Sequence, residues 1–356
     1  MKILITAPDL EESRNVSGIS TVVRQIIAHR PSQYAHFVAG SADGERKGVK
    51  WLLKQCILPI RFIGAIVRER PDVIHINTAL TDLSIWRDLL LLLIGKGSGR
   101  PLVLAIHGGK YLMDRAAGMM VGRAIGMMLR WAAEVVVLSE IERGSLLLRW
   151  PNINIAALPN AVDIRNAPEA ARSNAVPVVV FLGRLHESKG IRQLAEVCGR
   201  LHGAGSEFIF RCYGDGPERE WLINKMHENV SGSFEYRGVV AGKEKWAALA
   251  SSDIFVLPSI YGEGMPMALL EAMACGCVVI ASDNASIAAV IKNGENGYLV
   301  PAGDVDALAD TLEMAIAARG NRLMSDAAKR TIEEKFAIAP YFEQLDLIYS
   351  RAAAQV

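Results

Sequence analysis

Residues 253–283, DIFVLPSIYGEGMPMALLEAMACGCVVIASD, predict a strand, a loop, a helix and a second strand, in that order. The apolar run 253–258 ends at a proline, and the glycines within residues 261–264 indicate a turn. Pro266 is typical of the first turn of a helix, where its missing N–H leaves no hydrogen bond unmade. The helix expected over 267–274 is apolar on every side except at Glu271, and a buried strand is expected over 277–281. This alternation is typical of a parallel α/β sheet.

Glu263 and Glu271 bracket the expected helix start, and Glu271 is the only charged residue between Glu263 and Asp283. A carboxylate in so apolar a helix has to be paired or has to bind a ligand. In a structural interpretation, Glu271 meets a buried Arg or Lys. In a functional interpretation, the helix start offers N–H groups to a phosphate, and the two carboxylates accept hydrogen bonds from sugar hydroxyls. The chemistry of these residues alone leaves both interpretations open.

Residues 263–276, EGMPMALLEAMACG, resemble the motif of two glutamates separated by seven residues in the retaining glycosyltransferases of family four. The similarity continues through Val278-Val279, Gly294, Asn296-Gly297, Val300-Pro301 and Asp304. Met265 and Met267 stand where the family more often has Phe and Leu, a change that would reshape the sugar pocket. The resemblance implies two Rossmann-like domains facing across a cleft, the glycosyltransferase B fold.

Composition sets the broad class of the protein. The chain has 356 residues, 51% of them hydrophobic, which suggests two domains that each bury a full core. Its formal net charge of +1 argues against a nucleic-acid binder, which usually carries a strong basic excess. Five cysteines without a C-x-x-C pair indicate reduced thiols in a cytosolic protein. Neither a signal peptide nor a membrane span is expected, because the apolar runs are far shorter than about 20 residues.

The first half of the chain alternates expected strands and helices. Strands are expected over 2–7, 36–40, 72–78, 102–109 and 134–139. Gly18 lies in the loop after the first strand, where parallel α/β folds place phosphate; taken alone it is a plain turn residue. By resemblance, His107 stands where the family has a histidine facing the donor sugar. A methionine-rich helix is expected over 111–133, and its methionines are typical of core gap-filling.

Residues 46–68 combine several cations with many large apolar residues and contain no acidic residue. A basic amphipathic segment of this kind can lie on an anionic membrane surface. The alternative is an ordinary helix that packs on the sheet with solvated Lys and Arg. We favour membrane contact because the segment is unusually apolar for a solvated helix, and Pro59 is expected to kink it.

A small, polar linker over 166–174 precedes a second α/β series that begins at residue 178. Residues 183–190, GRLHESKG, resemble the Gly-Arg, four residues, Lys-Gly signature of the same family. Arg184 and Lys189 can hold a diphosphate and neutralise the charge that builds up as it leaves; taken alone, they could be surface residues. By resemblance, the strand over 208–217 ends in Gly-Asp-Gly-Pro, and the segment that contains Arg237 and Val239 borders the nucleobase.

The alternating pattern predicts two domains, over 1–168 and 175–337. The resemblance implies that the first is the acceptor-side domain, that the second binds the nucleotide sugar, and that a helix over 338–356 returns to the first domain. The resemblance implies transfer of a sugar from a UDP- or GDP-linked donor with retention at the anomeric carbon. It further implies that Glu263 contacts the sugar hydroxyls, Glu271 the ribose and His107 the sugar from the other domain. The backbone expected to border the donor belongs to Gly183, Gly264, Met265, Pro266 and Met267.

The acceptor is less well defined by the sequence. Residues 46–68 suggest a lipid-linked glycan at the cytoplasmic face of the membrane, as in polysaccharide or lipopolysaccharide assembly. The alternatives are a soluble transferase acting on a small sugar or sugar phosphate, a nucleotide-sugar epimerase, and a binding protein without turnover. No cofactor and no metal are expected, and Asp304 is expected to cap a helix.

Overall fold

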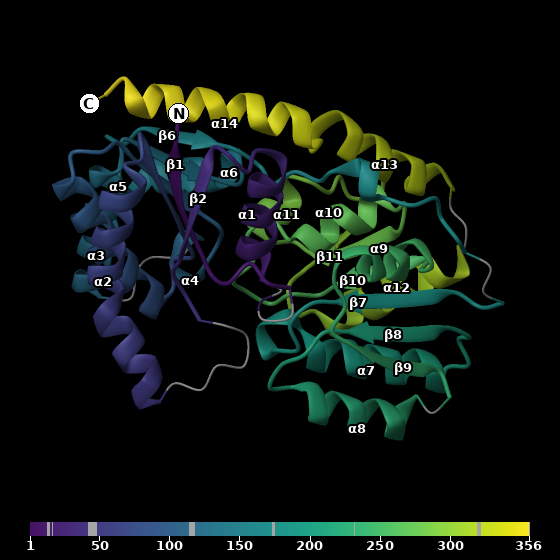
Figure 1. Cartoon of the computed structure of the whole chain (residues 1–356). Coiled ribbons are helices and arrows are strands. Elements are labelled where there is room, and N and C mark those ends of the chain that lie inside the picture. The colour runs from purple at the N-terminus through teal and green to yellow at the C-terminus, as the bar shows by residue number, and fades with distance from the viewer. Residues whose placement is uncertain are drawn as a thin grey trace. The chain divides into compact units, whose positions relative to one another are not determined.

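The computed structural model describes residues 1–12, 15, 17–41, 48–113, 118–172, 175–230, 232–318 and 322–355. The chain divides into two compact units, one made of Met1–Asn160 with Ala339–Val356 and the other of Ala161–Ile338 (Figure 1). Parts of the segments predicted above lie outside the described residues, namely residues 46–47, 114–117, 173–174 and 356.

The first unit is built on a parallel six-stranded sheet of order β2-β1-β3-β4-β5-β6. Its strands are β1 (Ile3–Ala7), β2 (Tyr34–Val38), β3 (Val73–Thr78), β4 (Leu102–Ile106), β5 (Glu134–Val137) and β6 (Ile155–Ala157). The helices that follow them are α1 (Gly18–His29), α2 (Val49–Glu69), α3 (Asp82–Gly97), α4 (Lys110–Met113), α5 (Met119–Trp131) and α6 (Glu140–Arg149).

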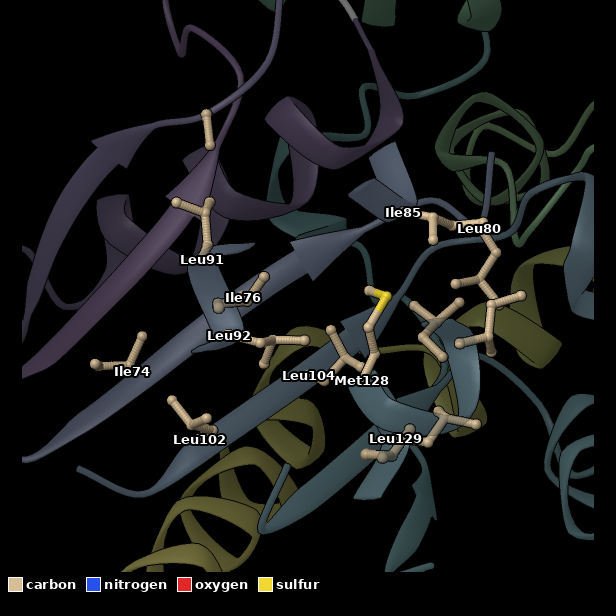
Figure 2. Packing of buried hydrophobic residues seen from close by; sticks show 14 of the residues in the cluster. Ile74, Ile76, Leu80, Ile85, Leu91, Leu92, Leu102, Leu104, Met128 and Leu129 are labelled. Atoms are coloured by element: carbon tan, nitrogen blue, oxygen red, sulfur yellow. The ribbon is translucent and has the colours of Figure 1, made fainter. Parts of the chain in front are cut away.

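Successive residues of β3 point to opposite faces of this sheet, as a strand requires. Ile74 and Ile76 pack with Leu91 and Leu92 of α3 and with Met128 of α5 (Figure 2). All five side chains are fully buried, and each contributes about 1.5–3 kcal/mol by leaving water. This face of the sheet therefore carries a mainly apolar core.

The opposite face of β3 carries His75, which lies against the C-terminal helix α14 (Ile338–Ala353). The Tyr349 hydroxyl is 2.7 Å from His75 Nδ1, and the Arg351 side chain pairs with Glu134 at the start of β5. On α14 the buried side chains are Tyr341, Phe342, Leu345, Ile348, Tyr349 and Ala352. The last helix of the chain thus completes the core of the first unit.

The second unit holds another parallel six-stranded sheet, of order β12-β11-β10-β7-β8-β9. Its strands are β7 (Val178–Leu182), β8 (Ile209–Tyr213), β9 (Phe234–Gly238), β10 (Ile254–Leu257), β11 (Val278–Ser282) and β12 (Tyr298–Val300). Its helices are the 3₁₀ turns η1 (Ile164–Asn166) and η2 (Glu187–Lys189), and α7 (Ile191–Gly203), α8 (Arg219–Asn229), α9 (Gly242–Ala250), α10 (Met267–Ala274), α11 (Ala285–Ala288), α12 (Val305–Ala317) and α13 (Arg322–Lys335).

The structure confirms the α/β class and the strands expected from the sequence, and it differs at several element boundaries. The helix α1 begins at Gly18, with Ser17 as its N-cap, so Gly18 lies in the first helical turn and not in the preceding loop. Pro266 is the N-cap of α10 rather than a residue of its first turn. The helix expected over 111–133 is present as α4 and α5, and Gly118 before α5 has a φ of 88°. Asp304 caps α12 as expected, accepting from the Ala307 N–H at 3.0 Å.

The basic apolar segment forms one helix, α2, that continues through Pro59. Its inner side buries Leu58, Phe62, Ala65 and Ile66, and its other side leaves large apolar side chains in contact with solvent. Over the part of the chain that the structure describes, no helix combines the length and the apolar character that a bilayer span needs.

Candidate active site

Two loops that are far apart in the sequence meet at the carboxyl edge of the second sheet. Lys189 lies in η2 after β7, and Glu263 lies in the loop after β10, 74 residues later. Lys189 Nζ is 2.5 Å from Glu263 Oε1, and the Ser259 hydroxyl donates to the same carboxylate oxygen. The Glu263 side chain is only 6% exposed, so its charge depends on these two donors for compensation.

Gly190 allows the close approach of these two loops. Its φ is +68°, and a Cβ at this position would lie 2.0 Å from the carbonyl oxygen of Pro258. Two residues away from that contact on each loop, the Ile260 N–H donates to the Ser188 carbonyl at 2.8 Å. Only glycine fits both the backbone conformation and the space, so Gly190 places Lys189 against Glu263.

The loops after β7 and β8 are joined in the same way. The Gly183 N–H donates to the Tyr213 carbonyl at 3.1 Å, and the Leu185 N–H donates to the Asp215 carbonyl at 3.0 Å. A Cβ on Gly214, whose φ is +134°, would lie 1.9 Å from the Gly183 carbonyl oxygen. Arg184 is exposed on the loop between these contacts. Carboxyl edges of parallel sheets are where α/β proteins bind ligands, and this edge presents both cations of the Gly-Arg, Lys-Gly signature.

The end of β9 continues this edge. The Gly214 N–H donates to the Gly238 carbonyl at 2.8 Å, which places Val239 next to the loop after β8. Val239 is half exposed. The Arg237 guanidinium pairs with Glu235 at 2.8 Å, and Arg211 pairs with the same carboxylate oxygen at 2.8 Å. The contact of this segment's backbone with a nucleobase, which the resemblance implies, stays a prediction.

Glu271 lies on α10 and is 1% exposed. Its Oε1 is 2.5 Å from Nζ of Lys245, a residue of α9 whose side chain is 16% exposed. This contact is the one that the structural interpretation of Glu271 expects, and the predicted contact with ribose stays a prediction. Lys245 was not identified from the sequence, where nothing but its place on the preceding helix distinguishes it.

The residues Gly264, Met265, Pro266 and Met267 lead from Glu263 into α10. Met265 and Met267 are buried, and the Pro266 carbonyl accepts from the Leu269 N–H at 3.2 Å. The two sulfur-containing side chains therefore pack inward from the segment that connects the two glutamates.

His107 and Gly18 belong to the first unit, and the other predicted site residues belong to the second. The half-buried ring of His107 follows β4, and its Nε2 is 2.6 Å from Oδ1 of Asn77 at the end of β3. Burial lowers the pKa of His107 to about 4, so the ring is neutral near pH 7. His107, Asn77 and His75 line a small cavity together with Tyr341 of α14.

His75 is a second buried histidine beside this cavity. Burial first, and then the neighbouring His107, lower the pKa of His75 to about 3. Asn77 and Tyr349 cannot be recognised from the sequence as partners of these histidines, because the two contacts join residues that are 30 and 274 positions apart in the chain.

Within the described ranges, no cluster of three or more His, Cys, Asp or Glu side chains is arranged to hold a metal ion. The positive groups of the site include the side chains of Arg184, Lys189 and Lys245.

Two parallel α/β units, with a last helix that belongs to the first of them, define the glycosyltransferase B fold. Residues 17–166 match the model of the family described as Glycosyltransferase Family 4, and residues 176–318 match that of Glycosyl transferases group 1. Together these two matches cover most of the chain, and the chain belongs to this glycosyltransferase family.

Curated relatives agree with this assignment. The chain is 31% identical over 206 residues to a Salmonella typhimurium glycosyltransferase that its name assigns provisionally to colanic acid biosynthesis, covering 52% of this chain and 51% of the relative. It is 28% identical over 251 residues to the phosphatidyl-myo-inositol mannosyltransferase of Mycobacterium leprae, covering 68% of this chain and 63% of the relative. The chain thus spans between about half and two thirds of the length of these relatives.

Solved structures share the fold over nearly the whole chain. Sucrose-phosphate synthase from Thermosynechococcus elongatus superposes with a TM-score of 0.83 at 18% identity, covering 100% of both chains. HepE from Anabaena in complex with UDP-glucose superposes with a TM-score of 0.77 at 16% identity, covering 98% of this chain and 99% of HepE. At such identities the similarity concerns the fold.

Proposed function

We propose that the protein transfers a sugar from a nucleotide-sugar donor to a glycan acceptor. The observation that carries this proposal is the convergence of Lys189 and Glu263 at the carboxyl edge of the second sheet, beside Arg184. A diphosphate is a better partner for the cations Arg184 and Lys189 than solvent is. The Glu263 carboxylate beside it is suited to accept hydrogen bonds from sugar hydroxyls. Family membership and the UDP-glucose bound to HepE support a nucleotide sugar as the donor.

In this proposal Arg184 and Lys189 hold the diphosphate and stabilise the charge on the leaving group as the glycosidic bond to the donor breaks. Glu263 orients the sugar, and Glu271, held by Lys245, binds the ribose. The backbone of Gly183 and of residues 264–267 lines the phosphates and the sugar. Transfer proceeds with retention at the anomeric carbon, an assignment supported by the family alone.

The donor is identified first by thermal shift with UDP, GDP, ADP and their common sugar conjugates. A ligand that binds only the folded protein raises Tm, and the shift grows as its concentration exceeds Kd. We expect a shift with one uridine or guanosine diphosphate and its sugar conjugate, and its loss in Lys189→Met. Lys225→Met serves as the matched control, because this lysine lies on α8 and pairs with surface Glu228. A well-folded protein that shifts with none of these nucleotides would contradict the proposed donor class.

The donor identified in this way is then incubated with candidate acceptors, and the product is read by NMR. An α-linked product from an α-linked donor supports retention, whereas a β-linked product, recognised by its coupling constants at the anomeric centre, excludes it. Activity that persists in excess EDTA supports the proposal that the cations of the site replace a metal. Release of an epimerised sugar without any acceptor would assign the protein to the epimerase class instead.

We further propose that the acceptor is lipid-linked and that α2 docks on the anionic inner face of the cytoplasmic membrane. The outward side of α2 exposes Leu52, Ile57, Ile60, Ile63 and Val67, with exposed fractions from 49% to 70%. Single exposed apolar residues are normal on proteins, but a whole helix side of them marks an interaction surface.

The neighbouring helix extends this apolar surface, and the charges on α2 suit an anionic partner. On α3, which packs beside α2, the exposed apolar side chains are Leu83, Trp86, Leu90 and Leu93. Lys54, Arg61 and Arg68 are exposed on α2, whose only acidic residue, Glu69, is already paired with Lys2 at 2.9 Å. A basic helix with an apolar side has the composition of an interfacial membrane helix.

This docking is tested by sedimentation with vesicles of anionic and of zwitterionic lipid. We expect binding to the anionic vesicles that weakens with salt and is abolished by charge reversal at Lys47, Lys50 and Lys54. Charge reversal at Lys225, Lys292 and Lys335, three lysines of the second unit, changes the net charge equally and is the matched control. Equal binding of both triple variants would exclude docking through α2 and favour a soluble acceptor.

A further inference from the structure

The orientation of the Asn77 side-chain amide is fixed by the neighbouring strand β1. Asn77 Nδ2 is 2.8 Å from the Thr6 carbonyl oxygen, and the Asn77 backbone N–H donates to the Thr6 hydroxyl at 3.1 Å. A carbonyl oxygen only accepts hydrogen bonds, so the amide nitrogen has to face Thr6. The amide oxygen Oδ1 therefore faces away from Thr6, and it faces His107.

That orientation decides which nitrogen of His107 carries the proton. His107 Nε2 is 2.6 Å from Asn77 Oδ1, an oxygen that only accepts. Nε2 is consequently the N–H donor. In a neutral ring the other nitrogen, Nδ1, then carries no proton and is an acceptor. Nδ1 makes no hydrogen bond to any of the residues that the structure describes.

The backbone around His107 is held as firmly as its ring. The His107 N–H donates to the Thr78 carbonyl at 2.8 Å, and the Leu80 N–H donates to the Gly108 carbonyl at 2.9 Å. At Gly109, whose φ is +120°, a Cβ would lie 2.4 Å from the Leu80 backbone nitrogen. The loops after β3 and β4 are thus locked together, and His107 has little freedom to leave Asn77 by a backbone movement.

We propose that Asn77 is a positioning residue that holds His107 as the neutral Nε2–H tautomer and presents Nδ1 as a hydrogen-bond acceptor for a hydroxyl group of the ligand. The part that concerns the ligand rests on the proposed function; the part that concerns the tautomer does not. Asn77 is 5% exposed and acts through His107. A ring with Nδ1 fixed as a hydrogen-bond acceptor favours a ligand group that donates, such as a sugar hydroxyl, and disfavours a ligand group that can only accept.

The tautomer is measured on the whole chain labelled with ¹⁵N-histidine, by long-range ¹H–¹⁵N NMR at pH 7. His107 is one of seven histidines, and a His107→Gln sample assigns its signals. We expect a protonated Nε2 and an unprotonated Nδ1. A protonated Nδ1, in the other tautomer or in the cation, would overturn the proposal without reference to any activity.

Two matched variants then test the contact between Asn77 and His107. Asn77→Asp puts a carboxylate against Nε2 and should raise the pKa of His107, because the anion favours the imidazolium. Asn154→Asp makes the same chemical change on an exposed residue of the same unit and should leave that pKa unchanged. An unchanged pKa in a folded Asn77→Asp would overturn the proposal, and if that variant does not fold, the tautomer of the natural protein still decides.

Kinetics separate the ligand part from the tautomer. With the donor found by thermal shift, Asn77→Ala should lower kcat about tenfold, as expected for one lost or misdirected hydrogen bond. The Tm shift produced by the free nucleotide should be unchanged. Transfer at the natural rate would overturn the ligand part. An absence of transfer by the natural protein with every donor would overturn the proposed function while the NMR result stands.

Discussion

At the level of single residues, two lysines compensate the charges of the nearly buried carboxylates Glu263 and Glu271. Each carboxylate is nearly buried, and each has one ammonium group 2.5 Å away. Lys189 is 24% exposed and is the last residue of the short 3₁₀ turn η2, whereas Lys245 is 16% exposed and lies within the helix α9. Lys189 is therefore the more accessible cation for an incoming anion, and Lys245 serves chiefly to compensate Glu271.

We expect Lys245→Met to destabilise the second unit by roughly 3 kcal/mol, because removing one partner leaves a buried charge without compensation. The measurement is urea unfolding followed by hydrogen exchange of amides in β10 and β11, the strands next to α10. Adding Glu271→Gln to this variant removes the charge as well and should recover part of the loss. Unfolding of Lys245→Met at the same urea concentration as the natural protein would show that Glu271 does not depend on Lys245.

The buried histidines make the first unit sensitive to acid. In the unfolded chain each has a pKa near 6.5, whereas burial lowers the pKa of His75 to about 3 and that of His107 to about 4. The unfolded chain therefore binds protons that the folded chain does not bind. Stability is fully present above pH 6.5 and falls as the pH decreases from there towards 4 and 3, by about 1.4 kcal/mol per pH unit for each histidine.

This dependence is measured by urea unfolding at pH 7.5, 6.0 and 5.0, with hydrogen exchange of the β3 amides as the probe. His75→Gln should make the loss of stability below pH 6.5 distinctly smaller. His202→Gln, a change on α7 of the second unit, should leave the slope for β3 unchanged. A His75→Gln protein with the natural slope would show that His75 is not the titrating group.

At the level of elements, the sequence predicts the long strands and not the short ones. The interior strands have four to six mostly apolar residues, and the structure confirms them. The edge strands β6 and β12 have three residues each, and neither has a fully buried run that distinguishes it from a loop. Their place in the sheet depends on pairing with β5 and β11, which local sequence does not contain.

In the candidate site, too, residues within local motifs are predictable from the sequence, whereas residues defined by tertiary contacts are not. Lys189 and Glu263 are recognisable from local motifs, and the structure brings them together. Lys245 and Asn77 were missed because a lone Lys or Asn carries no pattern, and their importance arises from partners 26 and 30 residues away. Residues that position other residues are defined by tertiary contacts, so they are the part of a site least accessible from sequence.

The loop after β7 provides a test of how elements position the site. Gly190→Ala should cost several kcal/mol, since its Cβ would lie 2.0 Å from a backbone oxygen and its φ is positive. We also expect the variant to lose nucleotide binding, because the movement that relieves the clash separates Lys189 from Glu263. Thermal unfolding with and without nucleotide measures both effects.

Gly18→Ala is the control for this variant. Gly18 is the first residue of α1, has no positive φ, and a Cβ there meets no atom within 4 Å. We expect its Tm to equal that of the natural protein or to exceed it slightly, because alanine favours a helix over glycine. Equal stability of the two variants would show that the loop after β7 tolerates a Cβ and that Gly190 does not position Lys189.

At the scale of the whole molecule, the two units are assembled differently from the linear chain. The second unit is one continuous segment, Ala161–Ile338, whereas the first unit needs both ends of the chain. Helix α14 supplies six buried side chains to the first unit, and its Asp346 and Arg351 pair with Arg30 and Glu134. The first unit is therefore incomplete until residues 339–356 have been made.

This arrangement predicts different behaviour for the two fragments of the chain. Residues 161–338 should unfold cooperatively when expressed alone, because their sheet and its helices are complete. Residues 1–160 alone should expose the apolar surface that α14 covers, leave His75 without Tyr349, and bind a hydrophobic dye with little hydrogen-exchange protection in β3. A synthetic peptide of residues 338–356 added to this fragment should restore protection, whereas the same peptide with Leu345→Ala and Tyr349→Ala should not. If residues 1–160 alone protect β3 as well as the natural chain does, α14 is not part of the core of the first unit.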